Sequence, residues 1–211
     1  MDELSREDRY GNRYDGSRQI RTCSWETSEF QDNFGSNYRF CIDYKNKTIN
    51  ILNEIEHSQD LRLVILSSNG KNFSAGADLN WMKRMSNASY DENMRDASSL
   101  TTMLQKLNNL AQPTLVIIKG AVFGGGVGLV SCCDISIASN ESIFSLSEVK
   151  VGLVPATIGP YVIQAIGERN ARRFFLTGER FGAEVAREIN LVHEVTAVSY
   201  THLTLPTNRE V

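Results

Sequence analysis

The chain has 211 residues, of which 41% are hydrophobic, enough to bury one sizeable core in a single domain. Its 22 basic and 25 acidic residues give a formal net charge of -3, which argues against nucleic acid as a partner because phosphate-backbone binding needs excess positive charge. The charged N-terminus lacks the apolar run of a secretory signal, and no run of ~18 apolar residues indicates a membrane span. We therefore expect a cytoplasmic location and no membrane partner.

The N-terminal segment, residues 1–48, carries no pattern that predicts a fold. Between Tyr10 and Tyr44, apolar residues follow neither the period of a strand nor that of a helix. We leave residues 1–48 unassigned, and a frameshift upstream would explain their composition.

From Leu61 onward, short β-branched runs alternate with helical stretches. LRLVILSS predicts a strand, and GADLNWMKRMS predicts a helix with Leu79, Met82 and Met85 on one side. The following stretch has a one-sided apolar stripe from Met94 to Ala111, which predicts an amphipathic helix ending before Pro113.

The second half of the chain continues this alternation. PTLVIIKGAV predicts a strand, GGGVGLVSCC a helix opened by glycines, DISIAS and SIFSLS two further strands, and PYVIQAIGERNARRFFLT a helix. The order predicts a layered α/β fold whose sheet has crossover helices. We interpret the Cys132-Cys133 pair as small apolar helix filler, because the four cysteines (with Cys23 and Cys41) lack metal-ligand spacing.

The last residues differ in character from this core. VSYTHLTLPTNREV is similar to the translation of a transposon-type sequencing adaptor, so we expect the natural chain to end near Ala197. The predicted organisation is therefore a core domain at 49–197 followed by an adaptor-derived segment at 198–211. A genuine strand and tail is the alternative.

Two glycine-containing loops stand between a strand and a helix. The first is FSAGAD at 73–78, and the second is Gly124-Gly125-Gly126. Small side chains let a ligand approach the backbone closely, and N–H groups that open a helix favour negative charge. Either loop alone is explained by turn geometry, but together they indicate an oxyanion site.

These motifs resemble a known family. FSAGADLNWMKRM, KGAVFGGGVGLVSCCDISIAS and FSLSEVKVGLVP, in this order, look like the crotonase (enoyl-CoA hydratase/isomerase) superfamily from about Ile49 to Ala197. The resemblance is closest to bacterial methylglutaconyl-CoA hydratase-type members of leucine breakdown. It implies a crotonase-like ββα spiral core.

The resemblance also implies site roles. The N–H groups of Ala77 and Gly125 would hold a thioester carbonyl oxygen as enolate charge builds on it, a role worth ~3 kcal/mol per donor. Glu148 would be the catalytic carboxylate, taking a proton from the water that adds to an α,β-unsaturated acyl-CoA. The expected substrate-binding residues are Ala75, Asp78, Leu79, Gly124 and Met82. Asp78 also has the alternative role of a helix cap.

One position departs from the family pattern. Most hydratases of the superfamily carry a second glutamate where this chain has Gly128, so Glu148 would act alone. We expect the missing carboxylate to remove repulsion and open space for a substrate with its own distal carboxylate, such as methylglutaconyl-CoA. A lone glutamate also serves the isomerases, which leaves double-bond isomerisation as the alternative reaction. A further branch of the family uses an aspartate nucleophile for dehalogenation or hydrolysis. The resemblance places Ala156 at that position, so this chain is not expected to belong to that branch.

Other features bound the function further. His57, His193 and His202 lie outside the motifs and are interpreted as surface or structural. Trp81, Met82 and Met85 have two interpretations, acyl-pocket lining or core. No metal and no cofactor are expected, since coenzyme A is part of the substrate. The family's C-terminal helices, which build a homotrimer or hexamer, are not recognisable after Ala197, so a non-catalytic acyl-CoA-binding fragment is a third interpretation.

Overall fold

The computed structural model describes residues 21–25, 42–58, 61–68 and 70–197. Its main sheet is parallel and has the spatial order β1 (Arg21–Trp25), β2 (Val64–Ser68), β3 (Thr114–Ile118), β5 (Ile135–Ser139) and β8 (Glu194–Thr196). In a second sheet, β6 (Ile143–Ser145) pairs parallel with β4 (Ala121–Phe123) and antiparallel with β7 (Arg180–Gly182). The predicted layered α/β class is confirmed, and the main sheet is parallel.

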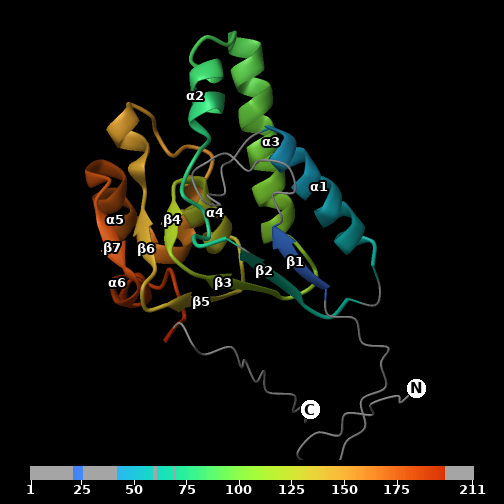
Figure 1. Cartoon of the computed structure of the whole chain (residues 1–211), viewed down its shortest axis with the longest axis vertical. Coiled ribbons are helices and arrows are strands. Elements are labelled where there is room, and N and C mark those ends of the chain that lie inside the picture. The colour runs from blue at the N-terminus through green and yellow to red at the C-terminus, as the bar shows by residue number, and fades with distance from the viewer. Residues whose placement is uncertain (1–20, 26–41, 59–60, 69, 198–211) are drawn as a thin grey trace, which may run out of the picture.

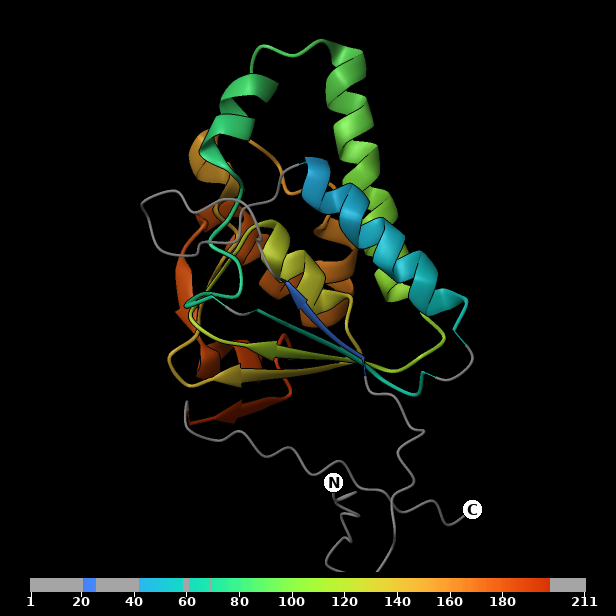
Figure 2. The same cartoon turned by 45° about the vertical axis from the view of Figure 1, so that its right-hand side comes forward.

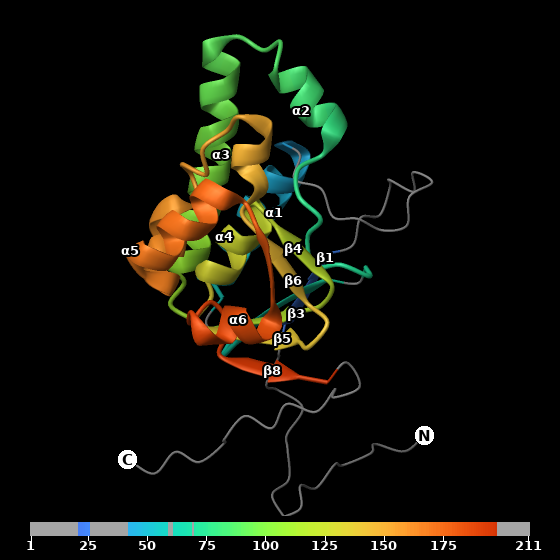
Figure 3. The same ribbon diagram turned by 90° about the vertical axis from the view of Figure 1, so that its left-hand side faces the viewer.

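The helices cover these sheets as Figures 1 and 2 show. They are α1 (Ile42–Glu56), α2 (Leu79–Met85), α3 (Tyr90–Asn108), α4 (Gly125–Ser131), the 3-10 helix η1 (Ser147–Val151), α5 (Gly159–Thr177) and α6 (Ala183–Glu188). α1 packs beside α3, α4 packs against α5, and α6 lies beside β8 at the sheet edge (Figure 3). α2 stands at the opposite end of the molecule from β8 (Figures 1 and 3).

The predicted strand PTLVIIKGAV is two strands, which corrects the sequence interpretation. β3 ends at Ile118 and β4 begins at Ala121, in a different sheet. Between them, Gly120 has φ +62°, a left-handed conformation that breaks a strand. One apolar run therefore serves two sheets.

Two N-terminal elements lie where the sequence showed no pattern. β1 pairs with β2 along its whole length, and α1 begins at Ile42, before the predicted boundary at residue 48. Long-range pairing rather than local periodicity places β1.

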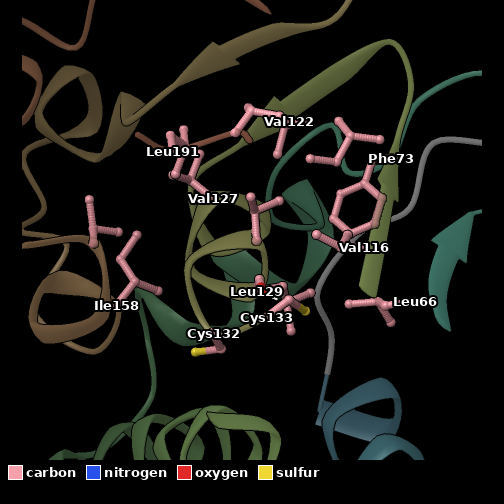
Figure 4. Packing of buried hydrophobic residues seen from close by; sticks show 14 of the residues in the cluster. Leu66, Phe73, Val116, Val122, Val127, Leu129, Cys132, Cys133, Ile158 and Leu191 are labelled. Atoms are coloured by element: carbon pink, nitrogen blue, oxygen red, sulfur yellow. Dashed lines mark hydrogen bonds between the residues drawn. The ribbon is translucent and has the colours of Figure 1, made fainter. Parts of the chain in front are cut away.

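The core is one apolar cluster that joins both sheets. In α4, Val127 and Leu129 lie among three other buried residues, which are Val122 of β4, Val116 of β3 and Ile158 (Figure 4). Cys132 and Cys133 are buried free thiols in the same cluster, as expected of apolar filler. α4 thus enters the interior of the molecule with its glycine-rich first turn directed to the loop at 73–78.

Candidate active site

The first glycine loop is fixed along β4. The Phe73 N–H donates to the carbonyl of Lys119 at 2.8 Å, and the Ser74 N–H donates to that of Ala121 at 2.9 Å. The Phe123 N–H returns a bond to the Ser74 carbonyl at 2.8 Å. Ser74 therefore holds the chain in parallel register immediately before Ala75 and Ala77.

Close backbone packing joins this loop to the second one. A Cβ at Gly126 would lie 2.6 Å from the Cβ of Ser74, and a Cβ at Gly76 would lie 3.8 Å from that of Phe123. Gly76 and Gly124 have φ values of +105° and +54°, which side chains other than glycine rarely adopt. Each glycine thus meets a specific requirement, of space or of conformation. The structure brings the two predicted loops side by side.

Gly125 opens α4, so its N–H has no acceptor within the helix. The preceding Gly124 donates its own N–H to the carbonyl of Ser145 at 3.0 Å, which ties the loop to the end of β6. Three residues after Ser145 comes Glu148. This bond explains how a residue distant in sequence reaches the second loop.

Glu148 lies against the second loop, but in η1 rather than at the strand end that the sequence predicted. The C-cap of η1 is Gly152, which has a left-handed backbone conformation with φ +73°. The Leu153 N–H donates to the Glu148 carbonyl at 3.0 Å. The carboxylate faces Gly124, where a Cβ would lie 3.0 Å from Oε1. A side chain at Gly124 would therefore occupy the space beside the carboxylate.

The Glu148 carboxylate is short of partners. Its Oε2 atom is buried and has no hydrogen-bond partner among the described residues. Burial raises the pKa of Glu148 above its ordinary value, because a charge withdrawn from water loses solvation. A half-buried carboxylate with a raised pKa and an unused oxygen is suited to accept and return a proton.

Gly128 does not open space near this carboxylate, which corrects our expectation. A Cβ at Gly128 would lie 2.4 Å from Cγ2 and 2.8 Å from Cβ of Ile158, a fully buried side chain. Where the family pattern has a second carboxylate, this structure has an apolar contact. Sequence reasoning missed this contact because Gly128 and Ile158 are far apart in the sequence and meet only in the folded structure.

The remaining predicted site residues lie around the first loop and α2. Asp78 caps α2, since its Oδ1 accepts from the N–H groups of Asn80 at 2.7 Å and Trp81 at 3.2 Å. This is the capping alternative that the sequence raised. Ala75 and Met82 are half-buried, and Leu79 is the first residue of α2.

A buried ion pair beside α2 was missed by the sequence analysis. The Lys45 Nζ lies 2.6 Å from Oδ2 of Asp96, and the side chains are 1% and 7% exposed. The indole N–H of Trp81 donates to Oδ1 of the same carboxylate at 3.2 Å. The available signal was that Asp96 stands four residues before Leu100, on the apolar stripe of α3.

The described histidines have hydrogen-bonding partners outside the candidate site. His57 contacts the Asn53 carbonyl at 2.6 Å, and His193 Nδ1 accepts from the Ser136 N–H at 3.0 Å. His202 lies outside the described residues, as does Cys41. No group of three or more metal-binding side chains occurs in the described part of the chain. Across the same residues, each helix is too short or too polar to cross a lipid bilayer.

Within an α/β fold, two paired glycine loops beside a half-buried carboxylate are an arrangement suited to proton transfer next to a developing oxyanion. Residues 38–204 match the enoyl-CoA hydratase/isomerase family, and the chain belongs to that family. The matched span extends beyond residues 48 and 197, where the sequence predicts segment boundaries.

Similar proteins agree with this assignment. An enoyl-CoA hydratase from Shewanella pealeana is 42% identical with a TM-score of 0.74, over 75% of this chain and 60% of that chain. An enoyl-CoA hydratase/isomerase from Marinobacter aquaeolei is 30% identical with a TM-score of 0.69, over 75% and 62% respectively. A mitochondrial Delta(3,5)-Delta(2,4)-dienoyl-CoA isomerase from Dictyostelium discoideum is 32% identical, over 72% of this chain and 55% of its own length.

The crotonase-like α/β fold implied by the resemblance is thereby confirmed. The chain spans about three fifths of the length of these relatives.

Proposed function

We propose that this chain carries the catalytic core of an enoyl-CoA hydratase, which adds water across the double bond of an α,β-unsaturated acyl-CoA. The observation that carries the proposal is the Glu148 carboxylate, which faces Gly124 beside the N–H of Gly125 and has an unpartnered buried oxygen. The family assignment supplies the substrate class.

The proposed reaction uses Glu148 as the base. Its Oε2 takes a proton from water, whose oxygen adds to the β-carbon of the enoyl group. The electrons of the double bond move toward the thioester oxygen, where the N–H groups of Ala77 and Gly125 stabilise the charge. Glu148 then returns a proton to the α-carbon, so no external acid or base is consumed.

Double-bond isomerisation is the second candidate, and the contact between Gly128 and Ile158 favours it. Moving a double bond requires one proton to be taken from one carbon and returned to another, which a single carboxylate can do. The apolar contact leaves Glu148 without the second carboxylate of the family pattern. The similarity to a dienoyl-CoA isomerase agrees with this candidate.

For the acyl group we propose methylglutaconyl-CoA, and with it a role in leucine breakdown. An apolar contact at Gly128 places no second negative charge where a distal carboxylate of the substrate would be repelled. A cytoplasmic location, a homotrimer or hexamer, and independence from a cofactor remain predictions.

One assay separates the candidates. The purified chain is incubated with a 2-enoyl-CoA and, separately, with a 3-enoyl-CoA, and the products are identified by mass. Hydration adds the mass of water to the first, whereas isomerisation leaves the mass of the second unchanged and creates a conjugated thioester.

Glu148→Gln is the test of the site. We expect it to reduce the active reaction by a factor of 10² to 10⁴, the usual contribution of a general base. Glu141→Gln, at an exposed glutamate in the turn before β6, is the matched control and should keep wild-type turnover. Full turnover by Glu148→Gln would refute the role of Glu148, and binding without turnover by the wild type would favour the non-catalytic interpretation.

A further inference from the structure

Three helices meet at one buried polar cluster, formed by Lys45 of α1, Asp96 of α3 and Trp81 of α2. The Lys45 ammonium contacts the Asp96 carboxylate at 2.6 Å and the Asp96 carbonyl at 3.4 Å. The other carboxylate oxygen accepts the Trp81 indole N–H at 3.2 Å. The Lys45 Nζ also lies 4.8 Å from the centre of the Trp81 ring. The Trp81 indole thus contacts Lys45 through its ring face and Asp96 through its N–H.

α2 has little else to hold it in place. It has seven residues, too few for a stable isolated helix, and it stands at one end of the molecule (Figure 1). Within the described part of the chain, Trp81 makes the only side-chain hydrogen bond from α2 to another helix. The orientation of α2 therefore depends on Trp81.

The first glycine loop is held independently of α2. Phe73 and Ser74 are fixed to β4 by backbone hydrogen bonds on the side of the loop away from α2. Ala77 lies between these fixed residues and Asp78, the cap of α2. A loosened α2 would therefore displace Met82 more than it displaces the N–H of Ala77.

The chemistry of the cluster suits such a role. A buried lysine paired with a carboxylate is a poor device for stability alone, because desolvation offsets much of the attraction. It is nevertheless directional, since the carboxylate accepts from Lys45 on one oxygen and from Trp81 on the other. This fixes one geometry of three helices.

We infer that Lys45, Asp96 and Trp81 are positioning residues that set the orientation of α2, and with it Met82, which the family resemblance implies is a substrate-binding residue. The inference rests on the proposed function, which supplies the acyl-CoA. None of the three belongs to the group formed by Glu148 and the two glycine loops, so we expect their effect in substrate binding more than in turnover.

Trp81→Phe is the sharpest test, because it keeps a ring for Lys45 and removes only the N–H that Asp96 accepts. In the full chain, we expect hydrogen exchange of residues 79–85 to quicken at least threefold. The KM for the enoyl-CoA should rise at least fivefold while kcat stays within twofold. Trp81→Ala, which removes the ring as well, should have the larger effect on both exchange and KM.

Lys106→Met is the matched control. Lys106 pairs with Glu56 at 3.1 Å and so also joins α3 to α1, but the pair is exposed and does not reach α2. We expect it to leave exchange at 79–85 and KM unchanged. Wild-type exchange and KM in Trp81→Phe would overturn the inference, and so would faster exchange with an unchanged KM.

The dissociation constant of a saturated acyl-CoA, measured by calorimetry, separates this inference from the proposed function. If the wild type binds the ligand but turns over neither enoyl-CoA, the proposed reaction fails and the dissociation constants of the two Trp81 variants decide the inference. Equal dissociation constants in wild type and both variants would overturn it.

Discussion

At the scale of single residues, Glu148 differs from an ordinary surface glutamate in two ways. Its Oε2 is buried without a partner, and burial raises its pKa. An unpartnered buried carboxylate costs folding free energy. Such groups occur mostly at functional sites, where their altered pKa serves the reaction. Both properties make the charged form of Glu148 less favourable than that of a surface glutamate.

The first prediction concerns the pH dependence of turnover. A general base acts when unprotonated, so kcat/KM should rise with pH and level off above the pKa of Glu148 in the free protein. Because burial raises that pKa, the inflection should lie above the ordinary value of 4.5. Rates with a 2-enoyl-CoA between pH 4 and 9 measure it. An inflection at or below 4.5 would contradict the assignment.

The same pKa makes a prediction about stability. A carboxyl whose folded pKa is raised binds more protons folded than unfolded, so its contribution falls as pH rises through the folded pKa. Glu148→Gln has no such loss. The difference in free energy of unfolding, variant minus wild type, should therefore be larger at pH 7 than at pH 4. Urea unfolding at both pH values measures the difference, with Glu141→Gln as control. A smaller difference at pH 7 than at pH 4 would refute burial as the cause of the raised pKa.

Gly128 and Ile158 show the limit of residue-scale reading. The sequence shows that Gly128 lacks a carboxylate, but not that Ile158, thirty residues later, fills the position. Local pattern carries no information on such a contact. The Gly128 site was therefore correctly marked as unusual and wrongly expected to be open.

A double-mutant cycle tests this contact. Gly128→Ala should cost about 1–3 kcal/mol by overpacking against Ile158. Ile158→Ala removes Cγ2, the nearer of the two atoms that would collide, and alone leaves a cavity costing about 2–5 kcal/mol. The double variant should be more stable than the sum of the two losses predicts, and urea unfolding measures all three. Simple additivity would show that the two positions are not in contact.

At the scale of elements, the sequence predicted best where periodicity and caps agree. The stripe through α3 begins after Ser89, whose hydroxyl accepts from the Glu92 N–H while the Glu92 carboxylate accepts from the Ser89 N–H. This capping box fixes the start of the helix. The predicted end, before Pro113, is later than the observed end at Asn108, because the apolar stripe continues to Ala111 beyond the helix.

Elements fixed by partners distant in sequence were not predictable. Lys45 and Asp96 are 51 residues apart, and each read alone is a surface charge. The segment FSLSE is strand-like in sequence, but β6 ends at Ser145 and the chain enters η1 at Ser147. Only the fold supplies the partners in both cases.

The ion pair gives the prediction at this scale. Lys45→Met leaves Asp96 buried without its cation and should lower the free energy of unfolding by about 3–5 kcal/mol. Lys106→Met breaks an exposed pair between the same two helices and should cost less than about 1 kcal/mol. Urea unfolding of both variants measures the contrast. Equal losses would mean that burial does not distinguish the pairs.

At the scale of the whole molecule, the predicted layered α/β arrangement was correct, but the sequence predicted one sheet where the described structure has two. A continuous apolar run is the expected sequence of any strand buried on both faces, so the run from Thr114 to Val122 fits one strand or two. Gly120 is the physical difference. The sequence contains it, but a glycine within a strand has several meanings, including a bulge.

Gly120 connects the two sheets. The chain leaves β3 there, and the following Ala121 N–H donates to Oδ1 of Asn72 at 2.9 Å. A Cβ at Gly120 would lie 2.4 Å from the carbonyl oxygen of Lys71 and 2.5 Å from that same Oδ1. An alanine at this position would thus collide with a backbone atom and would have to adopt an unfavourable left-handed φ. It would also disturb the start of the first glycine loop.

We therefore expect Gly120→Ala to destabilise the whole molecule. Overpacking and the positive φ together should cost at least about 2 kcal/mol. Because one apolar cluster joins both sheets, the loss should appear as a single transition at lower urea concentration rather than as a separate early step. Circular dichroism follows the backbone and Trp fluorescence the packing. Two transitions, or coincidence with the wild-type curve, would refute the view that Gly120 joins two sheets around one core.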